Sequence, residues 1–98
     1  MCGIGGILIY NSDASSGSYA EPLRRMGECL SRRGPDAEGT TTFEHGGLLH
    51  RRLAIMDPVP RSDQPMESRR WLLSYNGEIY NFRTLRQELS GAFNFETT

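Results

Sequence analysis

The residue types that could do chemistry begin at the amino terminus, with Met1-Cys2-Gly3. Aminopeptidases remove an initiator methionine when the second side chain is small, and this would make Cys2 the first residue. Its free α-amine could then accept the proton of its own thiol, so one residue would supply both nucleophile and base. The alternative is that Cys2 is a small packing residue without a chemical role.

A second group of polar residues could bind an amino acid. Arg51 and Arg52 offer guanidinium forks that can clamp a carboxylate through paired hydrogen bonds. The Asn76 amide and the Gly77 backbone N–H could form an oxyanion hole, and Glu78 could accept a hydrogen bond from an ammonium group. Simpler interpretations are paired arginines on a solvated strand face and an Asn-Gly hairpin turn of type I′.

The composition is typical of one small globular domain. The chain has 98 residues, of which 37% are hydrophobic and 23% are charged, with a net charge of −1. It lacks the charge excess of proteins that bind nucleic acid or a membrane surface. The longest apolar run, from Ile7 to Tyr10, is too short to cross a bilayer, and we identify no secretory signal. These features predict a cytoplasmic protein that binds neither nucleic acid nor membrane.

The residue types also exclude several kinds of chemistry. All 11 basic residues are Arg, so the chain contains neither a P-loop lysine nor a Schiff-base lysine. Four candidate metal ligands are scattered without the spacing of a zinc site: Cys2, Cys29, His45 and His50. We therefore predict that the chain holds no metal and that both cysteines are reduced.

The pattern of apolar residues predicts the elements that must position these side chains. Residues 2–10 are expected to form a buried strand and residues 11–18 a loop. An amphipathic helix is predicted from Tyr19 or Glu21 to Arg32, because apolar residues recur there at helical spacing. Residues 38–57 are predicted to form a β-hairpin whose turn lies around residues 45–47.

The second half of the chain is expected to be less regular. Three prolines predict a loop over residues 57–68, followed by a strand over residues 71–75. A second helix is predicted to begin after Asn81 as its N-cap and to end at Gly91. Residues 93–98 are predicted to start another strand, and a chain that stops inside a strand suggests a fragment.

Five sequence blocks follow one another along the chain. They are MCGI at 1–4, RRGPDAEG at 32–39, HRRLAIMD at 50–57, QPM at 64–66 and NGEIYN at 76–81. In this order they resemble the class II glutamine amidotransferase domain of glutamine-hydrolysing asparagine synthetases. The resemblance implies an α+β fold, the αββα sandwich of the N-terminal nucleophile (Ntn) hydrolases. Residues 1–98 would be a partial amidotransferase domain that stops before the family's Ser-Asp-x-Glu segment.

The resemblance also implies a role for each matching residue. Cys2 would attack the side-chain amide of glutamine, form a thioester and release ammonia, after which water frees glutamate. Asn76 and Gly77 would form the oxyanion hole. Arg52 would bind the substrate α-carboxylate, Glu78 would bind its α-amine, and Ile55 would line the pocket. Arg33 and Asp36 would support the loop beside the nucleophile.

The resemblance further implies a C-terminal synthetase domain outside these residues, in which ATP and Mg²⁺ activate aspartate for amidation. The chain itself is expected to need no cofactor and, taken alone, to be inactive. Two alternatives stay open: a class II amidotransferase with a different acceptor, and a non-catalytic α+β module that binds a partner. The oligomeric state is also open, with a homodimer as one alternative.

Overall fold

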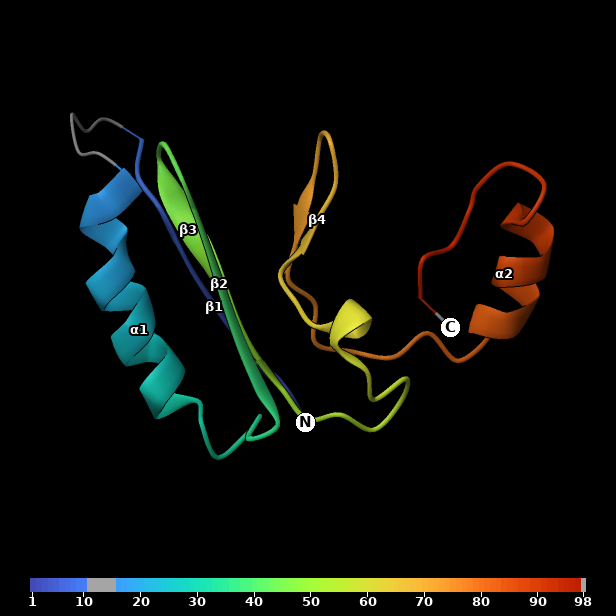
Figure 1. The fold of residues 1–98 in the computed structure, drawn as a ribbon, viewed down its shortest axis with the longest axis horizontal. Helices are drawn as coiled ribbons and strands as arrows, with labels where there is room; N and C mark the ends of the chain where they lie inside the picture. The colour runs from blue at the N-terminus through green and yellow to red at the C-terminus, as the bar shows by residue number, and fades with distance from the viewer. Residues whose placement is uncertain (11–15, 98) are drawn as a thin grey trace.

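An antiparallel sheet of three strands carries the amino terminus (Figure 1). The computed structural model describes residues 1–10 and 16–97. The strands are β1 (Gly3–Leu8), β2 (Ala37–Phe43) and β3 (Gly46–Arg52), and β3 lies in the centre. The predicted first strand and the hairpin are confirmed, although β1 ends two residues early and the hairpin covers residues 37–52 instead of 38–57. The fold class is α+β, with antiparallel sheets and helices.

Close packing of β1 against β3 requires a glycine where β3 begins. Gly46 has a φ of 156°, and a Cβ atom there would lie 1.9 Å from the carbonyl oxygen of Ile7. Any side chain would push the two strands apart. The register that follows pairs Gly3 with Arg51, which brings the amino terminus to the end of β3.

Helix α1 (Ala20–Cys29) packs on one face of this sheet, after the short 3₁₀ helix η1 (Ser16–Tyr19). The buried core consists of Tyr19, Leu23 and Leu49, with Ile7, Ile9, Met26 and Leu30 packed against it. The apolar stripe predicted for this helix is confirmed, because Leu23 belongs to the core and Met26 and Leu30 pack against it. The expected loop over residues 11–18 falls mainly outside the described residues.

Helix α1 ends at Cys29 rather than at the predicted Arg32. Residues 30–33 continue as turns, with the Gly34 N–H bonded to the Leu30 carbonyl at 3.3 Å. A Cβ atom on Gly34 would lie 2.2 Å from the Arg51 carbonyl group, so the two backbones touch here. The helix is shorter than its sequence pattern because the chain must turn early to make this contact.

A second, small sheet follows the proline-rich segment. The 3₁₀ helix η2 (Pro60–Ser62) precedes β4 (Met66–Glu67), which pairs with β5 (Leu72–Leu73). The loop predicted for residues 57–68 is therefore wrong at its end, where two residues gain a strand partner that local sequence does not reveal. The Asn76-Gly77 turn alternative is also not observed, since no strand follows it within the described residues.

Helix α2 (Phe82–Leu89) lies near the carboxyl end. Asn81 occupies the predicted N-cap position, but its side chain makes no capping hydrogen bond. The strand predicted for residues 93–98 is wrong over residues 93–97, and Thr98 lies outside the described residues. Instead, the Arg86 guanidinium stacks 4.6 Å from the centre of the Phe95 ring, which folds the tail onto the helix.

The elements follow one another across the molecule in the order α1, three-stranded sheet, β4–β5 sheet and α2 (Figure 1). The face of the first sheet opposite α1 thus points toward the second sheet, and the chain from β3 to β5 crosses between them. Within the part of the chain that the structure describes, no helix is long and apolar enough to span a membrane.

Candidate functional site

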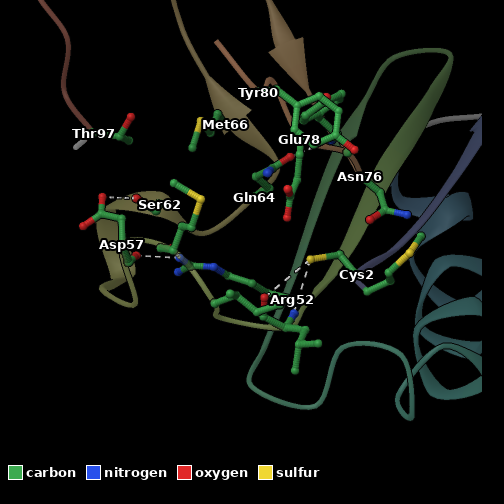
Figure 2. Close-up of a pocket in the computed structure, with 16 residues that line it drawn as sticks. Cys2, Arg52, Asp57, Ser62, Gln64, Met66, Asn76, Glu78, Tyr80 and Thr97 are labelled. Carbon is green, nitrogen blue, oxygen red and sulfur yellow. Dashed lines mark hydrogen bonds between the residues drawn. The ribbon is translucent and has the colours of Figure 1, made fainter. Parts of the chain in front are cut away.

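The pocket beside Cys2 brings together residues that are far apart in sequence. It has a volume of about 490 Å³ and is lined by the amino terminus, the end of β3 with its following loop, β4 and residues 75–80. Of the predicted site residues, it contains Cys2, Arg52, Ile55, Asn76, Gly77 and Glu78. Figure 2 shows the Cys2 sulfur, the Asn76 amide and the Glu78 carboxylate around the same cavity.

The Cys2 thiol lies against the backbone at the end of β3. The Leu53 N–H donates a hydrogen bond to Sγ at 3.3 Å, and Sγ lies 3.8 Å from the Leu53 carbonyl oxygen. Strand pairing of the neighbouring Gly3 with Arg51 produces this contact. The backbone N–H and carbonyl of Leu53 thus hold Sγ beside the pocket.

Arg33 and Asp36 lie outside the pocket and hold the backbone on either side of this thiol. The Arg33 Nε donates to the Cys2 carbonyl oxygen at 3.2 Å. The Asp36 carboxylate accepts from the Ala54 N–H at 2.7 Å, and the Asp36 N–H donates to the Arg52 carbonyl at 2.9 Å. Both residues therefore contact backbone next to Cys2 or Leu53, and their predicted supporting roles stay predictions.

Arg52 is buried and organises the loop that follows β3. Its Nη1 donates to the Val59 carbonyl at 2.9 Å and to Asp63 Oδ1 at 2.7 Å. Its Nη2 donates to the carbonyl oxygens of Met56 at 3.0 Å and Asp57 at 2.6 Å. Each terminal nitrogen has two N–H groups, so both have a full set of acceptors. The fork predicted to bind a carboxylate therefore already holds Asp63.

The loop around Arg52 contains further polar contacts that the sequence did not indicate. Asp57 has a φ of 45°, and its carboxylate accepts hydrogen bonds from Ser62 Oγ at 2.5 Å and from Arg61 Nη2 at 3.2 Å. Backbone in this region is unusual for a residue other than glycine, and the side-chain contacts compensate for it. Asp57 and Ser62 both line the pocket, so the shape of its wall depends on this small network.

The segment that carries Asn76 and Gly77 is held by side chains rather than by a strand partner. Gln64 Oε1 accepts from the Tyr75 N–H at 2.6 Å, and Ser74 Oγ donates to the Leu49 carbonyl at 3.0 Å. The QPM block of the sequence contains Gln64, but the sequence did not indicate that Gln64 contacts Tyr75. A Cβ atom on Gly77 would lie 2.5 Å from the Tyr75 hydroxyl, so the Tyr75 ring covers this glycine closely.

Within residues 1–10 and 16–97, no three His, Cys, Asp or Glu side chains come together as a group that could hold a metal ion. Both cysteines are free thiols, with Cys2 partly buried at the pocket and Cys29 exposed on α1.

A thiol at the amino-terminal end of a β-strand, above a pocket with an amide and a carboxylate, agrees with the family to which this chain belongs. The sequence model of the glutamine amidotransferase domain matches residues 1–98, so the chain is a member of that family. The predicted resemblance is confirmed.

The chain is similar to several asparagine synthetases that are named as glutamine-hydrolysing. It is 36% identical to asparagine synthetase 1 of Bacillus subtilis over 99% of this chain and 16% of the relative. It is 43% identical to asparagine synthetase 2 of Arabidopsis thaliana over 91% of this chain and 15% of the relative. It is 36% identical to asparagine synthetase B of Escherichia coli over 99% of this chain and 17% of the relative. It therefore spans only about a sixth of each.

Proposed function

We propose that this chain is the glutaminase part of a glutamine-hydrolysing asparagine synthetase and that Cys2 is its nucleophile. The observation that carries the proposal is that Cys2, Asn76 and Gly77 line the same pocket. The contact of the Leu53 N–H with Sγ supports it, because it holds the sulfur beside the pocket. The family membership and the relatives agree with this activity.

The proposed reaction begins after Met1 is removed. Sγ of Cys2 bonds to the side-chain carbonyl carbon of glutamine, and the resulting oxyanion is stabilised by the Asn76 amide and the Gly77 N–H. The free α-amine of Cys2 takes the thiol proton and passes it to the leaving nitrogen. The C–N bond breaks and ammonia departs, leaving a γ-glutamyl thioester. Water then adds to the thioester, and glutamate and the free thiol are released.

Glutamine would be held by its amino-acid end. Glu78 lines the pocket and would accept a hydrogen bond from the substrate α-amine, and backbone near Ile55 would contact the substrate from the same pocket. The α-carboxylate would meet Arg52, whose Nη1 now contacts Asp63 Oδ1. Because the terminal nitrogens already have four acceptors, substrate binding requires that the carboxylate replace Asp63 at this position. Arg33 and Asp36 would keep the nucleophile in place from outside the pocket.

The order of α1, the two sheets and α2 in Figure 1 is compatible with the Ntn αββα sandwich as the complete fold. Residues 1–98 would form its first part, and a later Ser-Asp-x-Glu segment would complete the α-amine site. In the whole protein, the ammonia would be used by a C-terminal synthetase domain that binds ATP and Mg²⁺ and amidates aspartate. Location in the cytoplasm and a homodimer stay predictions.

Labelling of the full-length protein tests the proposed nucleophile. A diazoketone that mimics glutamine should alkylate Cys2 and spare Cys29, which lies exposed on α1. The intact mass should lack Met1. The matched variants are Cys2→Ala, which should remain unlabelled, and Cys29→Ala, which should be labelled at the wild-type rate. Equal labelling of both thiols would favour a non-catalytic binding module instead.

A further inference from the structure

The segment just before the oxyanion residues is tied to β3 by an additional side chain, His50. Residues 74–79 form no helix or strand, so contacts from other elements must hold them. Nε2 of His50 lies 3.1 Å from the Tyr75 carbonyl oxygen, one residue before Asn76. The Leu49 carbonyl accepts a hydrogen bond from Ser74 Oγ, and Gln64 Oε1 accepts one from the Tyr75 N–H. The path of the chain into Asn76 is therefore set by three tethers.

His50 is fully enclosed in the middle of β3, with an exposed fraction of 1%. It stands opposite Ile4 on β1 and Gly39 on β2, so its side chain lies on the face of the sheet where the Ile4 side chain lies and where a Cβ on Gly39 would point. A Cβ atom on Gly39 would lie 2.1 Å from the Gln64 carbonyl oxygen. The absence of that Cβ lets the chain at Gln64 approach the sheet beside His50. The imidazole thus lies between the first sheet and the segment that leads to the oxyanion residues.

The partner of His50 determines which ring nitrogen carries the proton. A carbonyl oxygen only accepts, so Nε2 must be the N–H donor, and Nδ1 is then the unprotonated nitrogen of the neutral ring. Nδ1 is buried and has no hydrogen-bond partner among the described residues. Burial lowers the pKa of His50, the nearby Arg52 guanidinium lowers it further, and the Tyr75 contact and Asp63 oppose the shift. A buried nitrogen without a partner is costly, so the hydrogen bonding of this ring within the described residues rests on Nε2 alone.

We propose that His50 is a positioning residue for the oxyanion hole: its neutral Nε2–H holds the Tyr75 carbonyl and thereby places the Asn76 amide and the Gly77 N–H over Cys2. This rests on the proposed function of Asn76 and Gly77. The imidazole touches neither substrate nor nucleophile. Its effect passes through the peptide that joins Tyr75 to Asn76, where consecutive Cα atoms are only about 3.8 Å apart.

The proposal predicts an effect on the chemical step rather than on substrate binding. Misplacement of a reacting geometry by about 1 Å can cost about 100-fold in rate, and loss of one oxyanion donor costs about 100- to 1,000-fold. Loss of the tether should shift the donors without removing them, so we expect kcat to fall about 10- to 100-fold. The KM for glutamine should change less than about threefold, because Arg52, the proposed ligand of the α-carboxylate, is held by its own contacts with the loop after β3.

Two substitutions in the full-length protein separate positioning from packing. His50→Gln places an amide N–H near the position of Nε2, whereas His50→Met fills a similar volume without a donor. Glutaminase kcat and KM should be measured together with two probes of Cys2. A γ-glutamyl aldehyde forms a tetrahedral adduct whose oxygen needs the oxyanion hole, whereas iodoacetamide alkylates the thiol without it.

We expect His50→Met to lower kcat and to weaken aldehyde binding by similar factors, with iodoacetamide alkylation within about twofold of wild type. His50→Gln should recover most of both losses. The proposal is overturned if His50→Met retains wild-type kcat and aldehyde affinity, if only KM changes, or if Gln restores stability but not kcat. Wild-type protein without glutaminase activity would instead refute the proposed function itself.

If His50→Met does not fold, the wild-type protein still decides the question. Nitrogen-15 NMR of the His50 ring should show the neutral tautomer with its proton on Nε2. A proton on Nδ1 would remove the donor from the Tyr75 carbonyl and overturn the proposal.

Discussion

Replacing Asp63 by Asn tests whether Arg52 exchanges partners when glutamine binds. Asp63 Oδ1 contacts Arg52 Nη1 at 2.7 Å, with side-chain exposures of 40% and 9%. Because Asp63 is well exposed, we discount the pair to about 1 kcal/mol, the upper end for exposed pairs. Removing this competitor should therefore lower the KM for glutamine about two- to fivefold, since 1.4 kcal/mol corresponds to a factor of ten. Asp63 touches no reacting atom, so kcat should stay within about twofold.

The assay is steady-state glutaminase kinetics of the full-length protein, with two controls. Asp63→Glu keeps the competing charge and should not lower KM. The substrate analogue 4-aminobutanamide has the amine and the side-chain amide of glutamine but no α-carboxylate, so its KM should not respond to Asp63→Asn. A rise in KM for glutamine would refute the reasoning, because it would show that Asp63 shapes the pocket rather than competing for Arg52.

Three further predictions concern the Cys2 nucleophile, the Arg52 guanidinium and the backbone contact between Gly34 and Arg51. Cys2→Ala should abolish glutamine-dependent asparagine synthesis in the full-length protein but leave ammonia-dependent synthesis, since only the ammonia source is lost; loss of both activities would contradict this division. Arg52→Lys should raise the KM for glutamine at least about tenfold, because an ammonium group cannot reproduce the planar fork or satisfy its four present acceptors; an unchanged KM would count against the role of Arg52. Gly34→Ala should destabilise the fold by about 1–3 kcal/mol, because its Cβ would lie 2.2 Å from the Arg51 carbonyl group. Thermal unfolding should show this loss, with Gly91→Ala as a matched control in open space; equal melting temperatures would contradict the contact.

Sequence patterns predicted the elements that depend on repeated local spacing. The stripe of Leu23, Met26 and Leu30 predicted α1, because a helix presents such positions on one face. The β-branched run before Gly46 predicted the β2–β3 hairpin. The patterns failed where a partner distant in sequence decides the outcome. β4 exists only because Met66 pairs with Leu73, and residues 93–97 form no strand despite their composition.

The candidate site, like the fold, was predictable from the sequence only in part. The sequence by itself determined the family, the thiol at Cys2 and the blocks that contain Arg52, Asn76 and Glu78, because side-chain types and their order are written in it. Only the tertiary structure decided what those side chains meet. Arg52 lies within a ring of backbone acceptors, and His50 reaches the Tyr75 carbonyl. Every residue carries a similar backbone carbonyl, so no sequence pattern can indicate which one a donor will find; that depends on where the folded chain passes.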